Sequence, residues 1–180
     1  MLIRPDQSLL LVVDVQEKLA PAIHDGAAAI ANNRRLLASA GRLEIPVFVS
    51  EQYVRGLGGT VADLLPLPAG TQLVEKMHFS CTREPGFLEK LAAHGRRQIV
   101  VTGMETHVCV LQTVLGLLEA GYAVFLVEDA ASSRTPKNRS AAVERMRAAG
   151  THIVTTEMVV FEWLQKAGTE DFRALLPLIK

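Results

Sequence analysis

The sequence has no excess charge of either sign, because 19 Lys and Arg residues balance 19 Asp and Glu residues. A balanced charge provides no general attraction to DNA, RNA or an anionic membrane surface. We therefore expect neither a nucleic-acid partner nor a membrane partner.

Long hydrophobic runs are also missing. Asp14 stops the apolar run from Leu9 to Val13, and Glu119 interrupts the stretch after Val114, whereas a spanning helix needs about 20 apolar residues. The charges that follow Val13 argue against a secretory segment and favour a first strand.

Cysteine is scarce, with only Cys81 and Cys109, which allow one disulfide at most. No secretory feature accompanies them, so we expect free thiols and a cytoplasmic protein.

The length and composition are those of a globular protein. The chain has 180 residues, of which 49% are hydrophobic and 21% charged, so overall disorder is excluded. No repeat or low-complexity segment divides it, and we expect one domain over residues 1–180.

Short aliphatic runs alternate with helical patterns. Most of the runs are continuous in Val, Leu, Ile and Phe, as in strands covered on both faces. The predicted strands are Ser8–Asp14, Pro46–Ser50, Gln72–Glu75, Gln98–Thr102, Ala123–Glu128 and His152–Thr155.

The predicted helices are Ala27–Ala40, Gly86–Ala93, Thr106–Ala120, Pro136–Ala149 and one or two helices after Glu157, the last opening near Asp171. Glycines are expected to stop four of them, at Gly41, Gly95, Gly121 and Gly150. Repeated strand–helix–strand order predicts an α/β fold, a doubly wound and mainly parallel sheet with helices on both faces.

Ligands of such sheets bind at the carboxyl ends of the strands, where the winding direction switches. Asp14, Lys76 and Cys109 lie at or just after three predicted strand ends. If the sheet brings the first, third and fourth strands together, these side chains converge on one pocket.

Cys109 has the strongest local argument. If Thr106 caps the following helix, Cys109 lies in the first turn, where free N–H groups and the helix dipole favour a thiolate. A thiolate is the nucleophilic form, and the same N–H groups would stabilise an oxyanion. The alternative is a packed apolar cysteine.

Asp14 and Lys76 supply the matching charges. A carboxylate directly after Leu-Leu-Val-Val needs a partner, and it would accept and return the thiol proton. Lys76 would favour the thiolate. The alternatives are a solvated turn carboxylate and a solvated edge lysine.

At these residues the sequence resembles the isochorismatase-like cysteine hydrolase family. The match lies in Val13–Gln16, Lys76–Ser80 and Gly103–Val110, and the pattern extends over nearly the whole chain. The resemblance implies a six-stranded parallel sheet and an Asp14–Lys76–Cys109 triad. It also implies a cis peptide between Met104 and Glu105, with the N–H groups of Glu105 and Cys109 as the oxyanion hole.

Within the family, a retained Cys109 favours cleavage of amide-like C–N bonds through a thioester, and the substrate stays open. Metal-dependent nicotinamidases carry histidines after the second strand, but Ser50–Gly59 contains none, so no metal and no cofactor are expected. The pattern is closer to isochorismatase-domain hydrolases without an assigned substrate.

The residues expected to line the substrate pocket are Gln16, Gln52, Tyr53, Phe79 and His107. The predicted function is therefore a cysteine hydrolase of a small molecule, in a homo-oligomer by resemblance. Two alternatives are a non-catalytic binding or scaffold protein and a thiol redox protein with Cys81 as the resolving cysteine.

Overall fold

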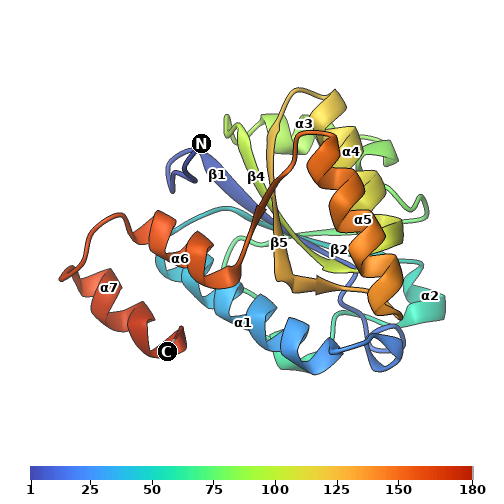
Figure 1. Cartoon of the computed structure of the whole chain (residues 1–180), viewed down its shortest axis with the longest axis horizontal. Helices are drawn as coiled ribbons and strands as arrows, with labels where there is room; N and C mark the ends of the chain where they lie inside the picture. The colour runs from blue at the N-terminus through green and yellow to red at the C-terminus, as the bar shows by residue number, and fades with distance from the viewer. Residues whose placement is uncertain (180) are drawn as a thin grey trace.

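The computed structural model describes residues 1–179, and its six strands form one parallel sheet (Figure 1). The strands are β1 (Ser8–Val13), β2 (Val47–Gln52), β3 (Gln72–Lys76), β4 (Gln98–Met104), β5 (Ala123–Ser132) and β6 (His152–Val154). Their order is β3-β2-β1-β4-β5-β6, so the winding direction reverses between β1 and β4. The predicted fold class is confirmed.

The helices cover both faces of the sheet (Figure 1). They are α1 (Gly26–Arg42), α2 (Val54–Leu57), α3 (Phe87–Ala92), α4 (Leu111–Glu119), α5 (Pro136–Ala148), α6 (Thr156–Leu164) and α7 (Glu170–Leu175). Within residues 1–179, no helix is long and apolar enough to span a membrane.

Alternating side chains of β1 separate the core into two layers, as a buried parallel strand requires. Leu10 and Val12 pack in the layer covered by α1 and α6. Leu9, Leu11 and Val13 pack in the layer covered by α3, α4 and α5. Both faces of the first strand are therefore fixed by core packing.

The structure corrects several expected boundaries. Gly41 does not stop the first helix, which continues to Arg42. Gly95, Gly121 and Gly150 do have the positive φ angles of helix-ending glycines. The last helix starts at Glu170 rather than Asp171, because the Thr169 side chain accepts a bond from the Phe172 N–H.

The sheet order determines how the first, third and fourth strands lie relative to one another. β1 pairs with β2 and β4, whereas β3 lies at the sheet edge beyond β2. A contact between Lys76 and Asp14 must therefore cross the last residues of β2, because Lys76 is in register with Gln52 and Val13 with Ser50.

Candidate active site

Asp14 lies directly after β1 and is fully buried. Its φ angle of 50° turns the chain out of the strand, and its N–H donates to the Ser50 carbonyl at 3.1 Å. The carboxylate accepts one bond on each oxygen, from Lys76 Nζ to Oδ2 and from Ser50 Oγ to Oδ1, both at 2.7 Å. The carboxylate is thus fixed by two neighbouring strands.

Lys76 ends β3 and directs its buried ammonium at Asp14. The Nζ atom also donates to Gln52 Oε1 at 2.7 Å and to the carbonyls of Phe79 and His78 at 3.0 and 3.3 Å. Burial alone would lower the pKa of Lys76, but the charge of Asp14 together with the two thiols raises it. The side chain is therefore an ammonium at neutral pH.

Cys109 lies in a π-helical turn, Thr106–Val110, that joins β4 to α4. The turn follows a cis peptide between Met104 and Glu105, at the position that the resemblance implies. The N–H groups of Val108 and Val110 both donate to the Glu105 carbonyl, at 3.0 and 3.2 Å.

The expected cap of this helix is wrong. Glu105 occupies the N-cap position, and the Thr106 hydroxyl is buried without a hydrogen-bond partner within residues 1–179. The expected α-helix from Thr106 is correspondingly a π-helical turn followed by α4.

The structure also reverses the expected effect on the Cys109 thiol. Burial and the negative charge of Asp14 raise its pKa, and the opposing effect of Lys76 is smaller. Because Asp14 and Lys76 already neutralise each other, a resting thiolate would add an unpaired buried charge. Cys109 is therefore a thiol at rest, and Asp14 is the base within range.

The side chain of Glu105 is anchored by the loop after β5. Its Oε2 accepts bonds from the backbone N–H and from Nε of Arg134, both at 3.0 Å. His107 lies nearby, with Nδ1 at 3.0 Å from Ser133 Oγ and Nε2 at 3.2 Å from Asn138 Nδ2. These contacts attach the turn that carries Cys109 to the end of β5 and the start of α5.

Besides His107, the residues expected to line the pocket fall into two groups. Tyr53 and Phe79 are 51% and 55% exposed, and both lie beside the end of β3. Gln16 and Gln52 are buried and bonded to protein groups. Gln16 Nε2 donates to the carbonyls of Gln52 and Gly58, and its Oε1 accepts the Gln52 N–H.

Gln16 therefore joins the segment after β1 to the end of β2 and to Gly58, and its role as a substrate contact stays a prediction. Gln52 donates from Nε2 to the Met77 carbonyl at 2.9 Å and accepts from Lys76, so it also supports the ammonium. Sequence reasoning missed Ser50 and Arg134, whose contacts depend on strand register and loop position.

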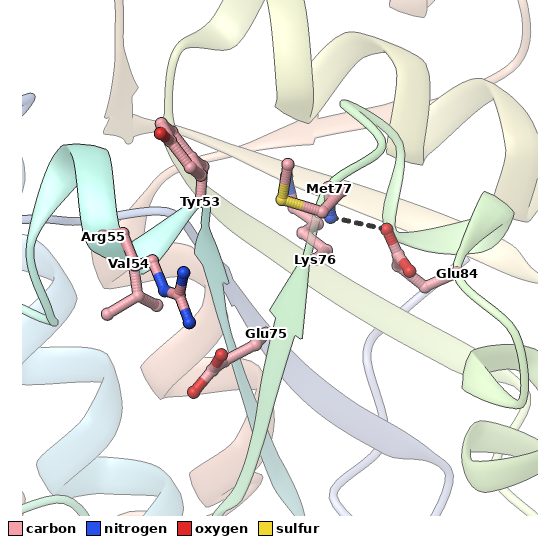
Figure 2. Close-up of a pocket in the computed structure, with 7 residues that line it drawn as sticks. All are labelled: Tyr53, Val54, Arg55, Glu75, Lys76, Met77 and Glu84. Carbon is pink, nitrogen blue, oxygen red and sulfur yellow. Dashed lines mark hydrogen bonds between the residues drawn. The ribbon is translucent and has the colours of Figure 1, made fainter.

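A cavity of about 370 Å³ opens beside Lys76 and is lined by Tyr53, Val54, Arg55, Glu75, Lys76, Met77 and Glu84. In Figure 2, Arg55 and Glu75 face the same space, and the dashed bond joins the Met77 N–H to Glu84, at 2.7 Å. The lining includes Lys76 but neither Asp14 nor Cys109.

Cys81 is fully buried and, like Cys109, is a free thiol. Burial, followed by the charge of Asp14, raises the pKa of Cys81 to about 11. Among residues 1–179, no group of three or more His, Cys, Asp or Glu residues is placed to hold a metal ion.

The sheet order and the polar groups at its switch point define a doubly wound α/β protein of hydrolase-like fold. Residues 8–158 match the isochorismatase domain family, and the chain belongs to this family.

One curated relative and two solved structures show what the chain is similar to. A secreted isochorismatase effector from Phytophthora sojae is 37% identical, over 98% of this chain and 86% of its own. The MAR1 ribonuclease structure from Caenorhabditis elegans is 37% identical with a TM-score of 0.94, covering 99% and 92%. The YcaC gene product of Escherichia coli, described as an octameric hydrolase of unknown specificity, has a TM-score of 0.93 at 22% identity, covering 99% and 90%.

Proposed function

We propose that the chain is a cysteine-dependent hydrolase that cleaves an amide-like C–N bond in a small molecule. The observation that carries this proposal is the buried ion pair between Lys76 and Asp14, 2.7 Å long, close enough to Cys109 to affect its pKa. Such a pair costs desolvation energy, and catalysis would explain its position beside a buried thiol.

The reaction begins when Asp14 accepts the Cys109 proton as the sulfur attacks the substrate carbonyl. The N–H groups of Glu105 and Cys109 stabilise the resulting oxyanion. The C–N bond then breaks, and the amine leaves with the proton from Asp14. Water, deprotonated by Asp14, attacks the thioester, and the carboxylic product leaves as Cys109 regains its proton.

In this reaction Lys76 keeps Asp14 oriented while its own donors stay on protein acceptors. Tyr53, Phe79 and His107 are the proposed substrate contacts, with Gln52 as a support for Lys76. Of these contacts, Tyr53 lines the cavity beside Lys76, whereas Phe79, His107 and Cys109 are not part of its lining.

The test is turnover of a panel of amides, ureas and carbamoyl compounds, followed by intact-protein mass spectrometry. We expect Cys109→Ala to lower turnover about 10⁴-fold or more while the fold is retained. Cys81→Ala is the matched control and should stay active. Full activity of Cys109→Ala would refute the nucleophile, and equal loss in both variants would favour the thiol redox alternative.

RNA cleavage is the second candidate, because the 37% identical C. elegans structure is described as a ribonuclease. The zero net charge gives this chain no general attraction to a polyanion. Adding RNA to the panel decides between the two: RNA cleavage that persists in Cys109→Ala would support this candidate and not the amide hydrolase.

We also propose that the chain functions as one domain, in a homo-oligomer and in a reducing compartment such as the cytoplasm. The octameric description of the E. coli relative supports oligomerisation, and two buried free thiols support a reducing compartment. The P. sojae relative is described as secreted, so the cytoplasm is not the compartment of every family member.

A further inference from the structure

Ser50 is a polar residue at a fully buried position of β2, directly opposite Val13 of β1. It contacts Asp14 twice: its carbonyl accepts the Asp14 N–H at 3.1 Å, and its hydroxyl lies 2.7 Å from Oδ1. The same serine therefore holds both the backbone and the side chain of the proposed base.

The direction of the side-chain bond follows from charge. An ionised carboxylate has no proton to donate, so the single hydroxyl proton of Ser50 must point to Asp14. Lys76 occupies the other oxygen. Bonds from two strands therefore fix the rotation of the carboxylate.

The other titratable groups around Asp14 are Lys76 from β3, Cys109 from the π-helical turn and Cys81 from the turn after β3, since each is coupled electrostatically to Asp14. Cys81 and Cys109 are neutral at rest. Lys76 and the Ser50 hydroxyl are thus the groups that stabilise the anion.

We propose that Ser50 is a positioning residue, which holds the Asp14 carboxylate in the orientation that accepts the Cys109 proton. This inference rests on the proposed function, because it assigns Ser50 to the same proton transfer.

The experiment follows the rate of Cys109 alkylation by iodoacetamide against pH in the full chain, with peptide mapping to assign the thiol. The alkylation rate is expected to fall at low pH, and this fall is the acid limb of the profile. Removing a hydrogen-bond donor from an anion disfavours its ionised form, so Ser50→Ala should move the midpoint of the acid limb upward by about 1 pH unit. Ser50→Thr keeps the hydroxyl and should restore the limb. Ser39→Ala is the control, because Ser39 is equally buried but donates to the Arg35 carbonyl in α1.

An acid limb that is unchanged in Ser50→Ala overturns the role of Ser50. If Ser50→Ala does not fold, Ser50→Cys keeps the size with a weaker donor and must shift the limb in the same direction, and no shift overturns the proposal. The alkylation profile needs no substrate, so it is independent of turnover. Loss of turnover in Cys109→Ala with no shift in Ser50→Ala rejects Ser50 alone, whereas full turnover in Cys109→Ala rejects the hydrolase.

Discussion

At the residue scale, the candidate site balances one buried carboxylate against one buried ammonium and adds two neutral thiols. This balance explains why Cys109 is a thiol at rest although Lys76 is near. In the proposed reaction, Asp14 accepts the proton as the sulfur forms its new bond, and the oxyanion hole stabilises the charge that develops on a bound carbonyl.

The second thiol gives a prediction about stability and pH. Cys81 has its pKa raised from an ordinary value of 9.0 to about 11. Between these values the unfolded chain has lost this proton and the folded chain has kept it, so the free energy of unfolding falls as pH rises. Two pKa units correspond to about 3 kcal/mol.

The measurement is urea unfolding at pH 8 and pH 10.5 in the wild type and in Cys81→Ala. We expect a smaller alkaline loss in the variant, because Cys109 and Lys76 titrate in both proteins. Equal losses would show that burial of Cys81 does not couple to folding.

At the element scale, the site depends on how closely the ends of β1 and β4 approach. Gly103 is opposite Val13 in the pairing of these strands. Its φ angle is +115°, and a Cβ there would lie 2.0 Å from the Val13 carbonyl oxygen. A side chain at this position would separate the strand that precedes Asp14 from the strand that leads to Cys109.

Gly103→Ala should therefore lower the free energy of unfolding by about 4 kcal/mol or more. Gly70 is the matched control, since its φ angle is also positive, +77°, but a Cβ there would meet nothing within 4 Å among the described residues. We expect Gly70→Ala to lower the free energy of unfolding by about 1 kcal/mol, the cost of placing a residue other than glycine at a positive φ angle. Similar denaturation midpoints for the two variants would contradict the close approach.

The strands and most helices were predictable because their signals are local. Aliphatic runs marked the strands, and Gly95, Gly121 and Gly150 marked helix ends. The helix end predicted at Gly41 is wrong, because nothing in the local sequence shows that α1 continues to Arg42. The sequence predicts an α-helix where the π-helical turn lies, because one turn of either kind of helix is too short to give a distinct apolar pattern.

Asp14, Lys76 and Cys109 were recognisable as strand-end residues and through the family resemblance. The order in which the strands pair could not be predicted, because the position of β2 between β1 and β3 depends on contacts that are distant in the sequence. Ser50 and Arg134 escaped for the same reason: each acquires its partner only through register or loop placement. The catalytic roles of Asp14, Lys76 and Cys109 and the positioning role of Ser50 stay predictions.

At the scale of the whole molecule, two of the regions that carry large exposed apolar side chains are candidate contact surfaces. Leu73, Met77 and Tyr53 belong to β3 and its surroundings, whereas Leu2 and Phe161 line a second cavity near α6. Exposed apolar regions of this kind mark contact surfaces more often than isolated side chains do.

We expect sedimentation to give a mass that is a multiple of 19.6 kDa. Leu73→Arg and Phe161→Arg each place a charge in one region and should each shift the equilibrium toward smaller species if that region is a subunit contact. A wild-type chain that sediments at 19.6 kDa would contradict the homo-oligomer.

The position of β3 at the margin of the sheet has a consequence for inactivation by heat. Among residues 1–179 its only strand neighbour is β2, while β1 and β4 are flanked on both sides. Marginal strands fray more readily than central ones, and fraying of β3 would withdraw the Lys76 ammonium from Asp14 while both core layers stay packed. We therefore expect turnover to be lost at a lower temperature than the midpoint of global thermal unfolding.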